Sequence, residues 1–381
     1  MTQEPVRIPF NRPTSSPATM THVAQAFASG HLAGDGPASR RCADLLADVT
    51  GSERVLLTPS CTAALEMAAL LLELEPGDEV IVPSFAFVST VNAFVLHGAQ
   101  PRFADVRPDT LNLDEAQLSE LVGPRTRAIV ALHYAGIACE MDSISGFAAD
   151  HDLAVIEDAA HALFGRYRGR RLGGIGDLGA LSFHETKNIT CGEGGALLIN
   201  RPGLAERAEI IREKGTNRSK FFRGEADRYT WVDLGSSYLL ADPLAAALVA
   251  QLEDAERIQA QRRAIWDRYA SALAPWAASN SVQLPFVPEE CEHPAHLFFL
   301  LFPTGESRDR CLDYLRACGI LGVFHYLPLH ISAMGRRFGG RPGECPVTES
   351  VAERLVRLPL YTDLVPTERD EVIDAVLKFS C

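Results

Sequence analysis

Short apolar runs alternate with segments of helical pattern through the first two-thirds of the chain, and this alternation restricts the fold more than any other feature. Helical segments, such as those at residues 62–74 and 90–97, separate several of the runs. Strands that are apolar throughout and joined by helices form mostly parallel sheets, because the helices then cover both faces. We therefore expect an α/β fold with a large domain over residues 1–250. Its strands are predicted at residues 54–58, 79–83, 101–106, 128–132, 153–157, 180–183 and 195–199.

The rest of the chain, residues 251–381, has a different pattern. One long helix is expected over residues 242–273, where Ala, Gln, Arg and Glu are frequent. Beyond it the pattern predicts a strand at 296–302, a helix at 307–318, a strand near 323–326 and a terminal helix at 367–379. A chain of 381 residues is long enough for two to three domains of roughly 150 residues each. We expect two, the second being a smaller α+β domain joined to the first by the long helix.

Charge and composition exclude several classes of protein. The chain has 49 acidic and 36 basic residues, a net charge of −13, which does not suit a general nucleic-acid binder. No apolar run approaches the roughly 20 residues that span a bilayer, and the first residues lack the pattern of a signal peptide. Nine cysteines without a C-x-x-C pair indicate a reducing compartment. We expect a cytoplasmic protein with neither a nucleic acid nor a membrane as partner.

Two short segments resemble known binding motifs, one for a dinucleotide and one for a metal, but their surroundings do not suit those sites. Residues 174–179 match G-x-G-x-x-G, but a strand-like run follows them where a dinucleotide site requires a helix, so a glycine-rich turn between strands is expected. His325 and His330 lie five residues apart across a proline, a spacing that does not place them on one helical face. We therefore expect no metal site, and a polar substrate pocket is the better interpretation of this pair.

Three other features together indicate a particular chemistry. A strand leads through residues 59–62 into a helix whose first N–H groups could bind an anion, although any capped turn looks similar. Asp158 ends an apolar strand, where it could serve a ligand or cap a helix. Lys187 lies between a strand and a glycine-rich turn, where it could be a confined nucleophile or an ordinary surface charge. A phosphate anchor, an acid and a lysine are the groups that bind pyridoxal 5'-phosphate.

Longer motifs around these residues carry a resemblance that covers nearly the whole chain. They are Gly36-Pro37, Ser60-Cys-Thr-Ala-Ala-Leu65, Glu157-Asp-Ala-Ala-His161, Ser182-Phe-His-Glu-Thr-Lys187 with the following Asn-Ile-Thr-Cys-Gly-Glu-Gly-Gly195, Glu213-Lys-Gly-Thr-Asn-Arg218, Gly235-Ser-Ser-Tyr238 and His325-Tyr-Leu-Pro-Leu-His330. With them the chain resembles the DegT/StrS family of sugar-nucleotide aminotransferases. The resemblance implies a pyridoxal-phosphate enzyme of fold type I.

By position, the resemblance also implies roles for individual residues. Lys187 would form the Schiff base with the cofactor and move a proton during transfer, and Asp158 would keep the pyridine nitrogen protonated. His161 would lie against the ring or its phenolic oxygen, with Phe85 stacked on the opposite face. The phosphate would be bound by Ser182, Thr62 and the Cys61 backbone. A second subunit of a homodimer would reach the phosphate near Ser237, where much of the family has Asn followed two residues later by a basic residue. This chain has Ser237 and Leu239 there.

The closest branch of the resemblance aminates dTDP-4-keto-6-deoxy-D-glucose at C4, with L-glutamate as donor. The substrate would lie near Arg212, Lys214, Arg218, His325, Tyr326 and His330. The basic residues among them belong to a segment, 212–228, that could receive a pyrophosphate or could be a solvated charged loop. Amination of a dTDP-3-keto-6-deoxyhexose at C3 is the sister activity, and a non-catalytic regulatory or binding protein is the alternative from another class. The pathway could serve a surface polysaccharide or an antibiotic deoxysugar.

Overall fold

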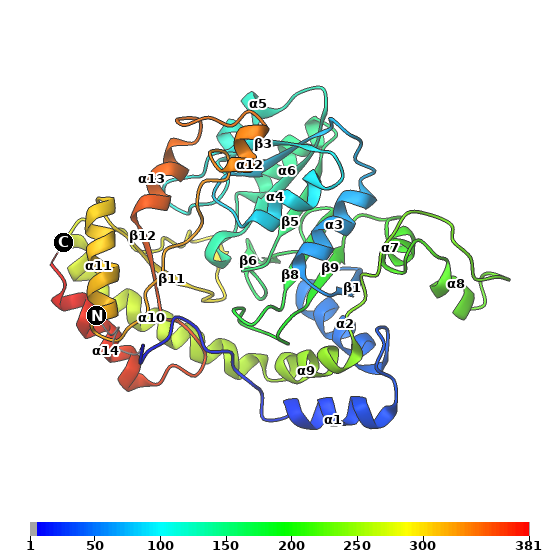
Figure 1. The fold of residues 1–381 in the computed structure, drawn as a ribbon, viewed down its shortest axis with the longest axis horizontal. Coiled ribbons are helices and arrows are strands. Elements are labelled where there is room, and N and C mark those ends of the chain that lie inside the picture. The colour runs from blue at the N-terminus through cyan, green and yellow to red at the C-terminus, as the bar shows by residue number, and fades with distance from the viewer. Residues whose placement is uncertain (1–5, 381) are drawn as a thin grey trace.

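The computed structural model describes residues 6–380, and its centre is a seven-stranded sheet with strand order β1-β9-β8-β5-β4-β2-β3 (Figure 1). Only β9 runs antiparallel to the strands beside it. The expected α/β fold with a mostly parallel sheet is therefore confirmed. The strands are β1 (Arg54–Thr58), β2 (Glu79–Pro83), β3 (Gln100–Ala104), β4 (Thr126–Leu132), β5 (Ala154–Asp158), β8 (Leu178–Ser182) and β9 (Gly195–Ile199).

Helices cover both faces of this sheet. Alternate residues of a strand point to opposite faces, so Leu56 packs with one helix layer while Val55 and Leu57 pack with the other. The first layer contains α3 (Cys61–Leu71), α4 (Val88–Val95) and α7 (Ala205–Arg212), and the second contains α2 (Pro37–Thr50), α6 (Met141–Asp150) and α9 (Asp242–Glu253). Helix α1 (Thr19–Ser29) lies against α9 (Figure 1). Burial on both faces explains why these strands read as continuous apolar runs.

A second apolar core lies around a two-stranded antiparallel sheet, β11 (Phe298–Leu301) and β12 (Leu355–Leu358). Helices α10 (Ala255–Ser279), α11 (Gly305–Ala317) and α14 (Pro366–Lys378) pack around it. The expected helices near 307–318 and 367–379 and the strand within 296–302 are thus confirmed. Ile8 near the N-terminus is buried in the same core and pairs with Ile320. The division of the chain at residue 250 remains a prediction.

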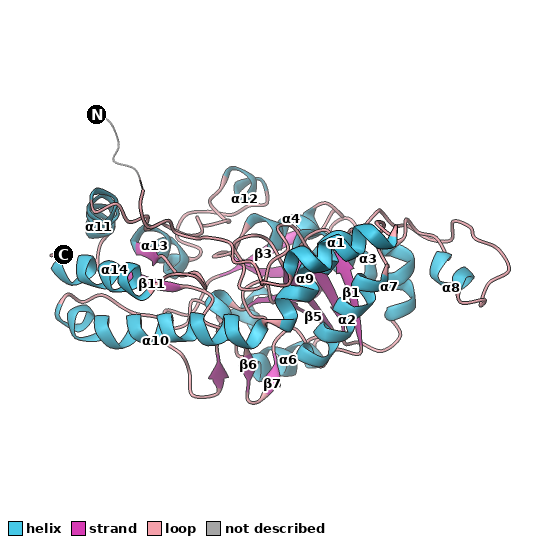
Figure 2. Ribbon diagram, turned by 90° about the horizontal axis from the view of Figure 1, so that it is seen from below, coloured by secondary structure: helices cyan, strands magenta, loops and turns pink. Residues whose placement is uncertain are grey.

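Smaller elements complete the molecule. A three-stranded sheet contains β6 (Arg166–Tyr167), β7 (Arg170–Arg171) and β10 (Cys291–Glu292), and short helices are α5 (Leu118–Leu121), α8 (Arg218–Phe222), α12 (Ala333–Arg337) and α13 (Pro346–Arg354). Helix α8 and its flanking loops project from the body beyond α7 in both ribbon views (Figures 1 and 2). We call the projecting residues 213–234 the arm. The expected glycine-rich turn lies between β7 and β8, although the last two residues of the segment 174–179 already belong to β8.

Two expected elements differ in the structure. The single helix predicted over 242–273 is interrupted at Asp254, which leaves helical geometry and accepts hydrogen bonds from Arg257, so α9 ends at Glu253 and α10 begins at Ala255. The strand predicted near 323–326 is only an isolated bridge between Val323 and Arg357, because the next residues turn to line a cavity. Among the described residues, no helix has the length and apolar character needed to cross a membrane.

Candidate active site

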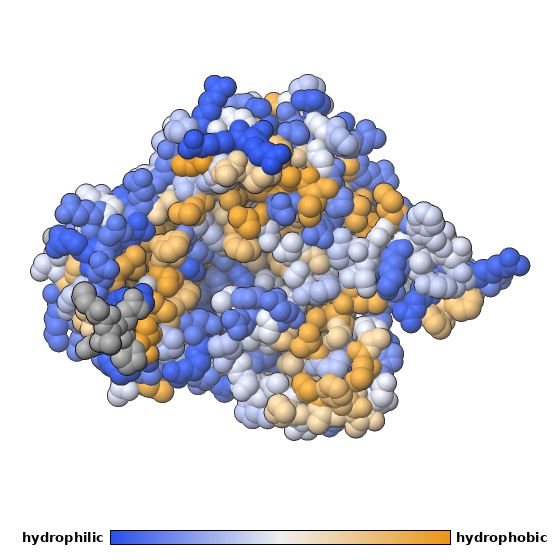
Figure 3. Space-filling model, in the orientation of Figure 1, coloured by the Kyte–Doolittle hydropathy of each residue, from blue (hydrophilic) through white to orange (hydrophobic). Residues whose placement is uncertain are grey.

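A cavity of about 940 Å³ lies at the carboxyl ends of the parallel strands, where sheets of this kind hold their ligands. In the space-filling view the front face is hollowed between the large sheet and the elements around β11 and β12 (Figure 3). Strand register explains why distant residues meet there. Thr58 of β1 and Ser182 of β8 both pair with Gly195 at the start of β9, and Asp158 of β5 pairs with Ala180 of β8.

The start of α3 forms one wall of the cavity. Ser60 caps this helix by accepting a hydrogen bond from the Ala63 N–H over 3.1 Å, and the Thr62 hydroxyl donates to Ser89 over 2.8 Å. Gly195 lies so close that a Cβ there would approach the Ser60 carbonyl carbon to 2.3 Å. Only glycine therefore fits at this position. The wall presents free helix N–H groups, with the side chains of Cys61, Thr62 and Ser182, to an anion.

Adjacent carboxylates of β5 have separate roles. Asp158 lines the cavity, accepting hydrogen bonds from the Thr90 hydroxyl over 2.7 Å and the Ala160 N–H over 3.2 Å. Burial raises the pKa of Asp158 above its usual value, and the hydrogen bond from Thr90 opposes the shift only partly. Glu157 faces away, accepting from His133 and from the N–H groups of the turn before β8. Asp158 is thus the carboxylate available to a ligand, and Glu157 holds the turn.

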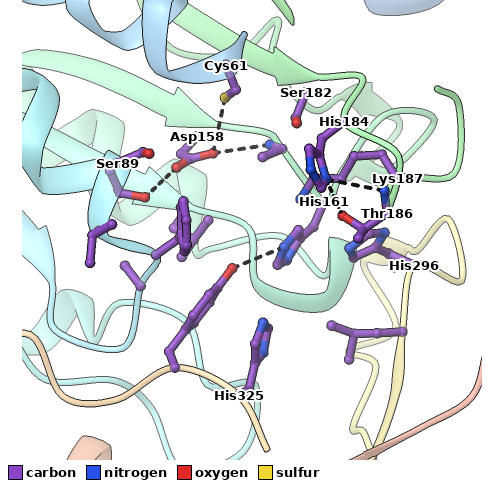
Figure 4. A pocket seen from close by; sticks show the side chains of 18 of the residues that line it. Cys61, Ser89, Asp158, His161, Ser182, His184, Thr186, Lys187, His296 and His325 are labelled. Carbon is purple, nitrogen blue, oxygen red and sulfur yellow. Dashed lines mark hydrogen bonds between the residues drawn. The ribbon is translucent and has the colours of Figure 1, made fainter. Parts of the chain in front are cut away.

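Lys187 faces Asp158 across the open space of the cavity (Figure 4). Burial lowers the pKa of Lys187 to about 8, although the nearby Cys61 and Asp158 act in the opposite direction. The sequence holds four lysines, Lys187, Lys214, Lys220 and Lys378, and Lys187 is the one that lines this cavity. A buried amine with a lowered pKa is a nucleophile at neutral pH.

Histidines and Tyr326 form the wall opposite α3, and Tyr134 lies buried behind it. The His161 ring stacks on His296 with centroids 4.2 Å apart, and the Tyr326 hydroxyl lies 3.2 Å from His161 Nε2. The Tyr134 hydroxyl forms a hydrogen bond with His325 Nδ1 over 2.7 Å. Burial lowers the pKa of His161 and of His325 well below the usual value, so both rings are neutral near pH 7. His161 Nδ1 is buried without a partner in the described chain and faces the same space as Lys187 (Figure 4).

Two predicted site residues lie outside the cavity. Phe85 is fully buried behind its wall, packed against Tyr134 and Tyr326 at centroid distances of 5.1 and 5.5 Å, so neither ring face is open. Phe87, two residues further on, lines the cavity and is 56% exposed. His330 is buried between Ser84 at 2.6 Å and Glu349 at 3.0 Å. Because both ring nitrogens already have partners, His330 does not line the cavity within one chain, and its place beside the substrate stays a prediction.

The predicted basic residues and Ser237 also lie away from this cavity. Arg212 is buried and donates two hydrogen bonds to Asp35, over 2.6 and 2.7 Å. Arg218 and Lys214 both pair with Glu213, at 3.2 and 3.7 Å. Ser237 is exposed at the base of the arm. Within one chain these cations are therefore compensated locally, rather than collected at the cavity.

The structure also adds residues that the sequence motifs did not identify. Phe87, Thr90 and Arg357 all line the cavity. Thr90 follows the second strand, at the same edge as Asp158, and this spacing was the signal that could have identified it. Arg357 comes from β12, far along the chain, and no local pattern connects it to the site. In residues 6–380, no group of three metal-ligating side chains is placed to hold a metal ion.

The comparisons with known proteins identify the class. A model of the DegT/DnrJ/EryC1/StrS aminotransferase family matches residues 14–377, and the chain belongs to this family. The spore coat polysaccharide biosynthesis protein SpsC of Bacillus subtilis is 32% identical over 377 residues, covering 97% of this chain and 96% of that protein. The aminotransferase TlmJ from Streptoalloteichus hindustanus has 31% identity and a TM-score of 0.87 over 97% of both chains. The PMP form of Spr1654 from Streptococcus pneumoniae, a putative sugar aminotransferase, has 26% identity and a TM-score of 0.90 over 97% and 98% of the two chains.

The protein is therefore a pyridoxal-phosphate-dependent aminotransferase of fold type I. Its cavity fits this cofactor on three observations of the chain itself. The amine of Lys187 is buried with a lowered pKa, the helix start at α3 is shaped for a phosphate, and His161 Nδ1 is an orphaned polar atom directed into the cavity. Asp158 lines the same cavity, and a carboxylate is the group that the pyridine nitrogen of this cofactor requires.

Proposed function

We propose that this enzyme transfers the amino group of L-glutamate to C4 of dTDP-4-keto-6-deoxy-D-glucose, giving a dTDP-4-amino-4,6-dideoxyhexose. The observation that carries the aminotransferase chemistry is the pair of Lys187 and Asp158 on opposite sides of one cavity. The name of Spr1654 gives sugars as its substrate class, and that of SpsC gives polysaccharide synthesis, which supports a sugar as amino acceptor here. The assignment of C4 and of the dTDP nucleotide rests on the resemblance in three motifs together, Ser182–Gly195, Glu213–Arg218 and Gly235–Tyr238.

Each side chain then has a defined task. The bound cofactor supplies an electron sink that stabilises negative charge at the donor's α-carbon. Lys187 would remove the α-proton of the donor and return a proton at the cofactor's C4′ position. Asp158 would hold a proton on the pyridine nitrogen, with its carboxylate oriented by the Thr90 hydroxyl. Ser182, Thr62 and the Cys61 N–H would bind the phosphate, and His161 would lie against the ring or its phenolic oxygen. Phe87 would take the stacking role that the resemblance implied for Phe85.

We further propose that the enzyme works as a homodimer whose arm reaches the partner's cavity. The arm bears exposed apolar side chains, including Phe222 at 72%, Trp231 at 75% and Leu234 at 64% exposure. Side chains of this size are normally covered by a partner. In such a dimer Lys214, Arg218 and Ser237 would lie near the partner's substrate or cofactor, with Arg212 anchoring the base of the arm. A monomer in light scattering with full activity would contradict this arrangement.

The reducing compartment follows from the thiols. Five of the described cysteines, Cys42, Cys139, Cys191, Cys291 and Cys345, are free and buried. We therefore propose the cytoplasm as the place of the reaction.

Amination at C3 of a dTDP-3-keto-6-deoxyhexose remains the second candidate, because both reactions use the same cofactor chemistry. The test combines purified protein, pyridoxal phosphate, L-glutamate and dTDP-4-keto-6-deoxy-D-glucose, and identifies the product by mass and proton NMR. The proposal expects an amino sugar, with couplings among H3, H4 and H5 that assign the C4 epimer. Lys187→Ala should abolish turnover, whereas Lys378→Ala, a change of an exposed lysine on α14, should not. No product despite conversion of the cofactor by glutamate would reject the C4 substrate, and an unchanged rate in Lys187→Ala would reject the mechanism.

A further inference from the structure

Arg357 is the one arginine that lines the cavity in the described chain. Arg357 belongs to β12. Its backbone pairs with Phe299 of β11 on one side and forms an isolated bridge with Val323 on the other. Its guanidinium lies 4.6 Å from the centroid of the Phe10 ring. The side chain is therefore directed to the cavity from a strand, between an aromatic ring and the segment that leads to His325.

The guanidinium has unused hydrogen-bonding capacity. Its Nε and Nη2 both donate to the Phe324 carbonyl, over 3.3 and 2.9 Å. A guanidinium has five N–H donors, and within residues 6–380 no partner occupies Nη1. No carboxylate of the described chain forms an ion pair with Arg357, in contrast to Arg212, Arg218 and Arg223, which all have one. A half-buried cation without an anion is costly unless a ligand supplies one.

The positive charge of Arg357 also influences the side chains around Lys187. Its positive charge contributes to lowering the pKa of Lys187, although burial is the larger cause. For His161 and His325 burial is again the larger cause of the lowered pKa, and the positive charge of Arg357 lowers it further. Arg357 and Lys187 thus line one cavity, so a molecule that reacts at Lys187 can present a charged group to Arg357.

We propose that Arg357 binds a carboxylate group of the amino donor. A planar guanidinium with one free edge matches a carboxylate through two parallel hydrogen bonds, and the Phe10 ring and the Phe324 carbonyl hold that edge in a fixed orientation. The cofactor's phosphate would be bound by a separate set of groups, those at the start of α3. This inference rests on the proposed function in that it takes an amino acid as donor. The pyrophosphate of a nucleotide sugar offers similar chemistry, and the test separates the two.

The test measures the donor half-reaction alone, without any sugar. Wild type and Arg357→Gln are loaded with pyridoxal phosphate, and the change in cofactor absorbance is followed as L-glutamate is varied. We expect the KM for glutamate to rise roughly 10- to 100-fold in Arg357→Gln, with a smaller change in kcat, because hydrogen bonds to a charged group are lost. Arg357→Lys keeps the charge and should recover part of the affinity. Arg354→Gln is the matched control, since Arg354 also donates only to carbonyls, those of Ser350 and Phe302, and does not line the cavity.

A second readout does not depend on turnover. Glutarate has both carboxylates of glutamate and no amino group, so its dissociation constant, measured by calorimetry, should rise by the same factor in Arg357→Gln and stay unchanged in Arg354→Gln. Unchanged KM and glutarate affinity in Arg357→Gln would overturn the inference and leave the pyrophosphate as the remaining anion. If the wild type binds glutarate through Arg357 but glutamate does not convert the cofactor, the proposed function fails and this inference stands. A wild type that binds no glutarate would overturn the inference as well.

Discussion

Replacing Glu157 with glutamine should destabilise the protein strongly while leaving the chemistry of the neighbouring Asp158 in place. Glu157 is fully buried, and each of its oxygens accepts two hydrogen bonds. Oε1 accepts from the N–H groups of Ile175 and Gly176, both over 2.6 Å, and Oε2 accepts from His133 Nε2 over 2.9 Å and from Gly173 over 2.7 Å. A glutamine has one oxygen only, so its NH₂ group would face two donors.

The size of the effect follows from the two lost bonds. His133 cannot become an acceptor at Nε2, because its Nδ1 already accepts from the Cys139 N–H over 3.1 Å. Two hydrogen bonds to a charged group, at about 1.5–3 kcal/mol each, give a loss of about 3–6 kcal/mol in the free energy of unfolding. That is a large part of the ~5–15 kcal/mol by which proteins are stable. Urea denaturation followed by circular dichroism, on apoenzyme, measures it.

The pH dependence gives a second check. Burial acts to raise the pKa of Glu157, but the hydrogen bonds from His133, Gly176 and Gly173 outweigh it and hold the pKa below its usual value. An acid with a lowered folded pKa adds stability that is complete above its unfolded value of about 4.3 and is lost as the pH falls through the folded value. The difference between wild type and Glu157→Gln should therefore be full at pH 7 and shrink below pH ~4.3.

Asp158→Asn is the matched control. Burial raises the pKa of Asp158, so its charge does not favour the empty fold, and the amide should change the free energy of unfolding by less than about 1 kcal/mol while turnover is lost. The reasoning is refuted if Glu157→Gln costs less than Asp158→Asn, or if its cost does not depend on pH in the acidic range.

Three further predictions concern the cofactor site. Because burial lowers the pKa of Lys187 to about 8, the rate of pyridoxal-phosphate incorporation into apoenzyme should rise up to pH 8 and level off above it, whereas a rise that continues to pH 10 would indicate an exposed lysine. Gly195→Ala should weaken cofactor affinity, because its Cβ would lie 2.3 Å from the Ser60 carbonyl carbon. Gly146→Ala on α6 is the control and should leave the affinity unchanged, since no atom lies within 4 Å of its Cβ. Equal cofactor affinity of the two variants in a titration would contradict the proposed phosphate site at α3. Phe87→Ala should weaken cofactor binding with little change in stability, and Phe85→Ala should cost about 3–5 kcal/mol of stability; the reverse result would restore Phe85 as the stacking residue.

Much of the fold could be predicted because its signals are local. The strands of the large sheet are apolar throughout, since both faces are covered, and β1, β2 and β9 begin and end at the predicted residues. Asp158 and Lys187 follow the ends of such strands, and the parallel arrangement then brings them to one cavity. For these two residues, a position at the end of a predicted strand was enough to place the side chain at the cavity.

The sequence is least informative where the position of a side chain depends on contacts between distant segments. Phe85 and Phe87 are equivalent in the sequence, and only the packing of Tyr134 and Tyr326 against Phe85 decides which ring remains open to the cavity. His330 lies in the same motif as His325, but Glu349, nineteen residues further on, occupies its second nitrogen. Local sequence patterns do not predict which distant side chains will contact a residue.

Charge compensation is a further case. The basic residues of segment 212–228 read as a receiver for an anion, but acids from α7 and from the arm pair with several of them. Arg223, for example, pairs with Glu209 and Glu225. Arg357 lines the cavity without an acidic partner among residues 6–380, and it comes instead from the strand β12 of the second apolar core, which a motif search centred on Lys187 does not reach.

Reduction of the holoenzyme with borohydride tests the central claim most directly, because it converts the Schiff base between a lysine and pyridoxal phosphate into a stable bond. Peptide mass spectrometry then locates the label among the four lysines of the chain. The account predicts the pyridoxyl group on Lys187 alone, and no label in Lys187→Ala. A label on Lys214, Lys220 or Lys378, or an unlabelled Lys187 in protein that has retained the cofactor, would contradict it.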